Sequence, residues 1–235
     1  MTNVELARFN MVEQQVRPWD VLDPQVLDLI QTTPREAYVP DSHKNIAYAD
    51  VEIPIGNGEV MLSPKHAARM LQALDVQAND IALEVGTGTG YITALLAQTC
   101  RHVFSVDLDG ELSTTAASNL AAQDIRNITL ETGCAASGWN KDGPYDVTII
   151  TGALPELPQS FKDSMQRGGR LIAIIGTAPV MEARAKQALP WLMSRRPRQD
   201  SQRCDGRHSL RNTCSSGFLL CCSQLQGKRV ESAIP

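Results

Sequence analysis

The fold is decided by one stretch, Ile81-Ala82-Leu83-Glu84-Val85-Gly86-Thr87-Gly88-Thr89-Gly90-Tyr91. A short apolar run ends in closely spaced glycines, and an apolar helical pattern follows them. This order predicts a strand, a tight loop and a helix, the unit that opens a nucleotide-binding α/β fold. Glycines accept positive φ angles and let a ligand approach the backbone. The helix N-terminus behind them presents free N–H groups to polar or anionic ligand atoms.

The spacing of the glycines separates this loop from two common phosphate-binding loops. The dinucleotide fingerprint is G-x-G-x-x-G. Here Gly86, Gly88 and Gly90 give G-x-G-x-G, and Tyr91 takes the place of the last glycine. The chain also has no G-x-x-x-x-G-K-[ST] motif. A nicotinamide dehydrogenase and an NTPase-type phosphate loop are therefore disfavoured, and a glycine turn without a ligand is the structural alternative.

Strands and helices alternate along the chain from residue 81 onward. Short β-branched apolar runs between helical patterns indicate a parallel sheet that is covered on both faces. The predicted fold class is therefore α/β, with a Rossmann-like, mostly parallel sheet and helices on both faces. Right-handed crossovers place a ligand at the carboxyl ends of the strands. We expect strands at 81–86, 102–107, 127–131, 145–150 and 170–175, and helices at 89–99, 111–123 and 158–166.

The segment before the sheet predicts a helical cover over residues 1–75, followed by a Rossmann-like domain over 76–184. Thr2 and Glu5 form a capping-box pattern, and the apolar face of the helix that follows would hold Leu6, Phe9, Val12 and Val16. Further helices are expected after two N-cap and proline pairs, Asp23-Pro24 and Ser63-Pro64. Residues 35–60 are rich in loop formers.

Asp107 ends the second strand, at the spacing where nucleotide-binding folds carry an acid for ribose hydroxyls. A carboxylate can accept two hydrogen bonds from a vicinal diol. The structural alternative is a helix-capping acid, because Asp109 and Glu111 crowd the same turn and negative charge suits a helix N-terminus. The glycine loop upstream favours the ribose role for Asp107.

Composition limits the cellular setting. The net charge is −4, so no overall basic balance indicates nucleic-acid binding. Neither a signal peptide nor an apolar run long enough to span a membrane is seen, and the predicted location is the cytoplasm. Of six cysteines, only Cys100 and Cys134 lie in the patterned part, and C-x-x-C spacing is absent, so no metal site is expected.

Residues 185–235 differ from the rest of the chain. They hold 9 Lys and Arg against 3 Asp and Glu, and they are rich in Ser, Arg and Cys. A basic tail can bind nucleic acid, but this one lacks interleaved aromatics. Poorly packed sequence is the favoured interpretation, and a shifted reading frame at the end of the gene would give the same break.

The chain from Val4 to Glu182 resembles the protein-L-isoaspartate O-methyltransferase family of class I S-adenosylmethionine (SAM) methyltransferases. The glycine loop alone would indicate only the class. The motifs that narrow the resemblance to the family are Pro34-Arg35-Glu36-Ala37-Tyr38-Val39-Pro40, Ala47-Tyr48-Ala49-Asp50, Ile53-Pro54-Ile55-Gly56-Asn57-Gly58 and Gly168-Gly169-Arg170-Leu171.

The resemblance implies SAM as the cofactor and methylation of the free carboxylate of isoaspartyl residues in damaged proteins, which are the implied partners. Ser63 is the implied catalytic residue. The implied cofactor-binding residues are Glu84, Gly86, Thr87, Gly88, Thr89, Gly90, Asp107, Leu108 and Cys134.

The chain departs from the family pattern in three places. The loop that usually reads Gln-Thr-Ile-Ser-x-Pro is Glu59-Val60-Met61-Leu62-Ser63-Pro64, so the family serine aligns with Leu62. An aspartate that could meet the adenine amine is replaced by Cys134, a weak acceptor. Residues 185–235 do not show the sequence pattern of the strands that complete the family sheet. We therefore expect SAM binding with weak or absent isoaspartyl methylation.

Methyl transfer to a carboxylate needs little acid–base help, because this nucleophile is already ionised near neutral pH. The absence of a His/Asp pair is thus no argument against an enzyme. Two alternatives stay open: a SAM methyltransferase with another acceptor, and a non-catalytic SAM-binding or interaction protein.

Overall fold

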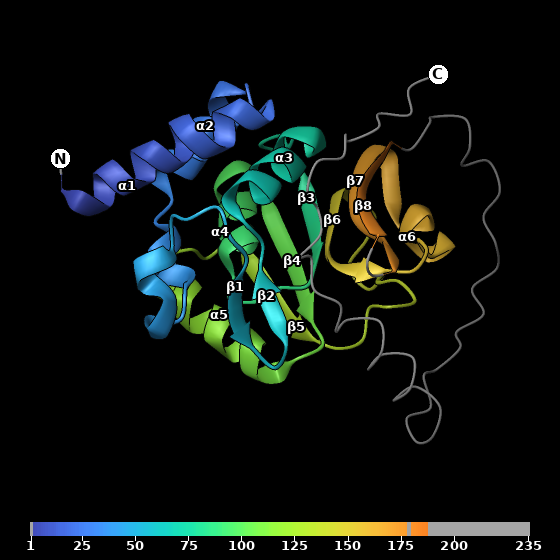
Figure 1. Ribbon diagram of the computed structural model, residues 1–235. Helices are drawn as coiled ribbons and strands as arrows, with labels where there is room; N and C mark the ends of the chain where they lie inside the picture. Colours follow the sequence, from blue (N-terminus) through green and yellow to red (C-terminus); the bar gives the residue numbers. More distant parts are fainter. Residues whose placement is uncertain (1, 178–179, 188–235) are drawn as a thin grey trace.

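The computed structural model describes residues 2–177 and 180–187, and its centre is a six-stranded sheet in the order β5-β4-β3-β6-β7-β8 (Figure 1). The first five strands in this order run parallel, and β8 runs antiparallel to β7. All five predicted strands are present, with β6 and β7 longer than expected. The strands are β3 (Ile81–Val85), β4 (His102–Asp107), β5 (Ile128–Thr132), β6 (Tyr145–Leu154), β7 (Met165–Thr177) and β8 (Val180–Gln187).

Successive residues of the central strands face opposite sides of the sheet, so each strand contributes to two apolar clusters. Leu83 and Val85 pack in one cluster, together with Phe161 of the short helix α6. Ala82 and Ile149 pack in the other cluster, with residues from the helices of the opposite face. Strands that are buried on both faces explain the continuous apolar runs in the sequence.

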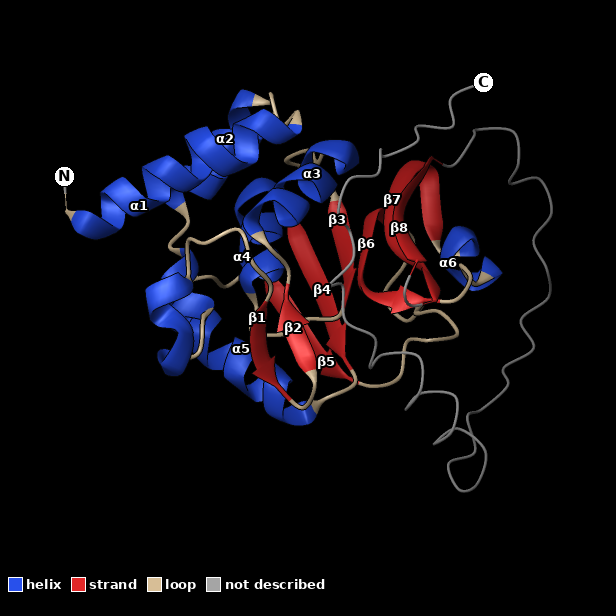
Figure 2. Cartoon of the chain, viewed as in Figure 1, coloured by secondary structure: helices blue, strands red, loops and turns tan. Residues whose placement is uncertain are grey.

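The two faces are covered unequally. In Figure 2 the larger helices lie on one side of the strands and, among the described residues, α6 alone lies on the other. The α-helices are α1 (Asn3–Met11), α2 (Pro24–Thr32), α3 (Pro64–Leu74), α4 (Tyr91–Thr99), α5 (Gly110–Ala122) and α6 (Gln159–Asp163).

The N-terminal helices begin where the sequence predicts. The Thr2 hydroxyl accepts a hydrogen bond from the Glu5 N–H, and the Glu5 carboxylate accepts one from the Thr2 N–H, so the capping box is formed. Asp23 caps α2 through the Gln25 N–H at 2.8 Å. A π-helical turn (Val12–Val16) and a 3-10 turn (Arg17–Trp19) extend α1. Shorter 3-10 turns follow at Arg35–Tyr38 and Asp41–Ile46.

A two-stranded antiparallel hairpin, β1 (Ile53–Gly56) and β2 (Glu59–Met61), lies in the segment predicted as loop. The register shifts between Pro54 and Gly56, and Gly56 has a φ of +108°. Strands this short give little sequence signal, because alternation over three or four residues is indistinguishable from loop. The hairpin leads directly into α3, and its second strand lies near the carboxyl ends of β3 and β4.

Two expectations need correction. The strand β8 was not predicted, although buried Met181 and half-buried Ala183 alternate with exposed Arg184 and Lys186. The helix predicted to reach residue 166 ends at Asp163, because Met165 already pairs with β6. The remaining tail predictions lie outside the described residues.

The first helix also differs from its predicted burial. Leu6 and Phe9 are 46% and 43% exposed, whereas Val12 and Val16 are buried. The helix projects past the edge of the molecule in Figure 1, so only its C-terminal end reaches the core. No helix in the described ranges is long and apolar enough to cross a membrane.

Candidate functional site

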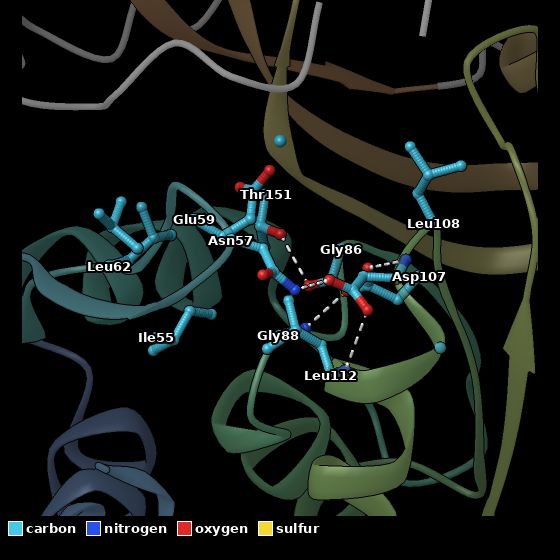
Figure 3. Close-up of a pocket in the computed structure, with 14 residues that line it drawn as sticks. Ile55, Asn57, Glu59, Leu62, Gly86, Gly88, Asp107, Leu108, Leu112 and Thr151 are labelled. Atoms are coloured by element: carbon cyan, nitrogen blue, oxygen red, sulfur yellow. Dashed lines mark hydrogen bonds between the residues drawn. The ribbon is translucent and has the colours of Figure 1, made fainter. Parts of the chain in front are cut away.

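A cavity of about 440 Å³ opens at the carboxyl ends of β3 and β4, between the glycine loop and the β1–β2 hairpin (Figure 3). This is the position that open α/β sheets use for ligands, and the volume lies within the range of small-molecule pockets. Its walls come from four segments that are far apart in sequence: 55–62, 86–88, 107–112 and 151–152. The lining residues are Ile55, Asn57, Glu59, Val60, Leu62, Gly86, Gly88, Asp107, Leu108, Asp109, Gly110, Leu112, Thr151 and Gly152.

The glycine loop forms one wall. Gly86 has a φ of +97°, and a Cβ built there would collide with Thr151 Oγ1. The Thr151 hydroxyl donates to the carbonyl oxygens of Val85 and Gly86, at 3.1 and 2.9 Å, and so fixes this turn. Glycine is required here both for the backbone angle and for the close approach of Thr151.

Asp107 lies at the rim of the same wall. Its Oδ2 accepts the Gly88 N–H at 2.8 Å and its Oδ1 accepts the Asp109 N–H at 2.9 Å. Asp109 is the residue that caps α5, through the N–H groups of Glu111 and Leu112. The capping role thus belongs to Asp109. Each carboxylate oxygen of Asp107 accepts one backbone bond and retains acceptor capacity for a ligand hydroxyl.

Glu84 does not reach the cavity surface. Its side chain is fully buried, and its Oε2 accepts hydrogen bonds from the hydroxyls of Thr93 and Ser105, at 2.5 and 2.7 Å. Burial raises the pKa of Glu84 to about 8, against the lowering effect of those two hydroxyls. The Oε1 atom is buried with no partner among the described residues. A neutral carboxylic acid beneath the loop is the form that this environment favours.

The hairpin forms the facing wall, which is mostly apolar. Ile55, Val60 and Leu62 line the cavity from this side. The wall is fixed from behind by Arg35, whose fully buried guanidinium donates to the carbonyl oxygens of Leu62 and Ala47, at 2.6 and 2.9 Å. The same guanidinium lies 4.9 Å from the centroid of the Tyr91 ring.

Ser63 is not among the residues that line the cavity. It is buried at the N-cap position of α3, makes no side-chain cap bond, and its hydroxyl lies 3.1 Å from Nδ1 of His66. The ungapped alignment, which puts Leu62 at the family serine, agrees with this arrangement because Leu62 faces the cavity. The one-residue slip that would bring the Ser63 hydroxyl to the site is not present.

The other residues that the resemblance implies for cofactor binding differ in their position relative to the cavity. Gly86, Gly88, Asp107 and Leu108 line the cavity, and Thr87 and Thr89 line a narrow pocket next to it. Gly90 begins α4 away from the cavity, where a Cβ would press on Leu120. Cys134 is exposed and lines neither of these two pockets.

Sequence reasoning missed four polar residues of the cavity: Asn57, Glu59, Asp109 and Thr151. Asn57 donates a hydrogen bond from its amide to the Asp109 carboxylate and so joins the two walls. Glu59 was noted only as part of a divergent loop. The sequence did contain a signal for Thr151, since this polar residue directly follows the apolar pair Ile149-Ile150. Within the described residues, no group of three or more His, Cys, Asp or Glu side chains could hold a metal ion.

Comparison with known proteins gives one consistent result. A family model described as protein-L-isoaspartate(D-aspartate) O-methyltransferase matches residues 8–198. The chain is 37% identical over 175 residues to "Protein-L-isoaspartate O-methyltransferase 1" of Rhodopseudomonas palustris, covering 74% of this chain and 71% of that protein. It is 38% identical over 170 residues to the Picosynechococcus enzyme of the same name, covering 72% and 77%.

Two solved structures share the fold. One, a protein-L-isoaspartate O-methyltransferase, superposes with a TM-score of 0.68 at 21% identity, covering 77% of this chain and 60% of that chain. The chain thus spans less than two thirds of that longer protein. The other is a Plasmodium falciparum protein of that description in complex with S-adenosyl-L-homocysteine. It has a TM-score of 0.63 at 18% identity and covers 78% of this chain and 88% of that chain.

Proposed function

Because the chain belongs to the protein-L-isoaspartate O-methyltransferase family, we propose that it transfers a methyl group from SAM to the free carboxylate of isoaspartyl residues in damaged proteins. The observation that carries the proposal is the cavity at the carboxyl ends of β3 and β4, which joins the glycine loop and Asp107 in one wall. The structural relative with bound S-adenosyl-L-homocysteine supports the choice of cofactor.

The residues present fit the proposed cofactor. The wall at Gly86 has no Cβ, so a ligand can lie against its backbone, and Asp107 offers free acceptor sites for a ribose diol. The cavity volume of about 440 Å³ suits a ligand of this size. Bound SAM would supply the electrophilic methyl group. We assign the ribose contact to Asp107 and the backbone contacts to Gly86 and Gly88.

The protein contributes alignment and exclusion of water, because the acceptor carboxylate needs no base. Ile55, Val60 and Leu62 provide the apolar wall against which an acceptor would lie. This wall carries no hydroxyl, and its one amide donor, Asn57, is engaged with Asp109. We infer weak turnover, reduced by about tenfold to a hundredfold if one donor bond is missing in the transition state.

The apolar wall also favours a second candidate, a SAM methyltransferase whose acceptor is less polar than a carboxylate. The cellular location in the cytoplasm and the isoaspartyl protein partner stay predictions from the sequence. So does the division into a cover (1–75), a sheet domain (76–184) and a tail (185–235), although cover and sheet residues pack in one apolar cluster.

The deciding experiment uses labelled SAM with a pair of peptides that differ only in an isoaspartyl or an aspartyl linkage. We expect base-labile label on the isoaspartyl peptide alone, at a low rate. Leu62→Ser, which restores a hydroxyl to the cavity wall, should raise that rate, and Leu62→Ala controls for the loss of bulk. SAM binding by calorimetry without label on either peptide would favour the second candidate.

A further inference from the structure

The cavity contains three carboxyl groups contributed by both of its walls. Glu59 lines it from β2, and Asp107 and Asp109 line it from the end of β4 and the start of α5. Figure 3 shows Glu59, Asn57 and Asp107 around the same space. Asn57 is neutral and donates to Asp109, so it holds the two walls together without changing the charge.

No positive side chain balances these carboxyl groups. Among the fourteen described residues that line the cavity there is no Lys, Arg or His. Arg35 lies behind the hairpin wall, where it is committed to two backbone carbonyl oxygens and to the Tyr91 ring. The cavity therefore becomes strongly negative when its three carboxyl groups are ionised.

The Glu59 carboxyl changes its charge just below neutral pH. Burial raises its pKa to about 6, with smaller contributions from the negative charges of Asp107 and Asp109. These are the titratable groups that share the cavity with it. Between mildly acidic and neutral pH, the charge of the hairpin wall therefore changes with the ionisation of Glu59.

We propose that Glu59 sets the charge selectivity of this cavity: its ionised carboxylate favours a cationic methyl donor over the neutral product and disfavours an acceptor carboxylate. The inference rests on the proposed function for the identity of the ligands. It goes further, because it assigns to a hairpin residue the preference for donor over product and the pH range in which the acceptor can enter.

The charges of the ligands give the proposal its physical basis. At neutral pH SAM carries a sulfonium, an ammonium and a carboxylate, whereas S-adenosylhomocysteine lacks the sulfonium and has no net charge. A nearby negative group in a partly desolvated cavity attracts the first more than the second. The same group repels an entering isoaspartyl carboxylate. Ionised Glu59 thus aids release of product and opposes binding of acceptor.

The binding test compares the dissociation constants of SAM and S-adenosylhomocysteine, measured by calorimetry at about pH 5 and about pH 7, on either side of the raised Glu59 pKa. We expect the preference for SAM to grow about fivefold to tenfold between these pH values in the unaltered protein, since an interaction of one charge shifts binding by this order. Glu59→Gln should show no such growth, and Glu59→Asp should retain it.

Glu52→Gln is the matched control. Glu52 lies just before the hairpin, and burial raises its pKa too, but its side chain does not line the cavity. It should leave the pH dependence of the preference intact. The proposal would be overturned if the preference for SAM over S-adenosylhomocysteine changed equally with pH in the unaltered protein and in Glu59→Gln. It would also be overturned if the preference did not change with pH in either protein. Thermal unfolding of each variant confirms that it folds.

The turnover test separates this inference from the proposed function. With the isoaspartyl peptide, kcat/KM should fall from about pH 5.5 to about pH 7.5 in the unaltered protein and fall less in Glu59→Gln. Turnover with identical pH profiles and a flat SAM preference overturns the role of Glu59 and leaves the proposed function standing. A pH-dependent SAM preference with no turnover supports the donor selectivity and contradicts the proposed function.

Discussion

The two walls of the cavity are built in different ways. The glycine wall lies at the carboxyl ends of two neighbouring parallel strands, β3 and β4; Asp107 closes it through the Gly88 N–H, and Thr151 of β6 fixes the Gly86 turn. The hairpin wall has only two short strands of its own and is held by distant residues, Arg35 behind it and Asp109 across the cavity. One wall thus belongs to the main sheet, whose strand ends the sequence pattern locates, and the other is held in place by contacts with distant segments.

The largest expected effect comes from Arg35→Ala, which removes the support of the hairpin wall. Two buried carbonyl oxygens lose their donor, so the free energy of unfolding should fall by about 3–5 kcal/mol. Arg17→Ala breaks only the exposed, solvent-screened pair with Glu13 and should leave the free energy of unfolding nearly unchanged. Urea denaturation measures both. Equal losses would show that Arg35 does not hold the wall.

Gly86→Ala tests the opposite wall. The added Cβ meets Thr151 Oγ1 at a positive φ, so we expect a loss of about 2–3 kcal/mol in stability and a large loss of SAM affinity. Gly56→Ala, in the hairpin, has a similar φ but no atom within 4 Å of the Cβ. It should show the cost of the backbone angle alone. A Gly86→Ala protein as stable as Gly56→Ala would mean that Thr151 yields freely.

Glu84, beneath the glycine wall, gives a pH-dependent prediction. Its folded pKa of about 8 exceeds the ordinary value of 4.5, so the folded protein keeps a proton that the unfolded chain releases. Stability should therefore decrease as pH rises between these two values, by at most about 1.4 kcal/mol per pH unit. Glu84→Gln stays neutral and should lose this slope. Urea midpoints over the range, compared between the two proteins, provide the measurement; parallel curves would contradict a raised pKa.

Asp107→Ala should weaken SAM binding by about 1–3 kcal/mol, because ligand hydroxyls lose an acceptor. It also frees the Gly88 and Asp109 N–H groups. Asp107→Asn keeps one acceptor oxygen and should lose less. Calorimetry that gives the same affinity for all three proteins would remove Asp107 from the ribose site.

The smallest effect is expected from Ser63→Ala. Its hydroxyl contacts His66 rather than the cavity, so SAM affinity should stay within about twofold and stability should fall by about 1 kcal/mol or less. Labelled turnover of the isoaspartyl peptide should also be unchanged. Abolished turnover in a folded Ser63→Ala protein would show that the loop slips by one residue during the reaction.

The sequence by itself determined the five parallel strands and the glycine loop. Five strands, the helix after the glycines and the position of Asp107 at a strand end all follow from apolar runs and glycine spacing. These features depend on residues close together in the chain, so local propensity and buried periodicity are sufficient to specify them. The sequence pattern did not show whether Asp107 or Asp109 caps the next helix, because two acids in one turn fit the pattern equally.

Only the tertiary structure decided which residues face the cavity across from the glycines. Leu62 and Ser63 are neighbours, yet one lines the cavity and the other turns to His66, because Arg35 fixes the Leu62 carbonyl from a segment far earlier in the chain. The same holds for Glu59, whose raised pKa depends on burial and on carboxylates of another element. Side-chain direction in a short hairpin is set by what packs behind it, and that information is spread over the whole fold.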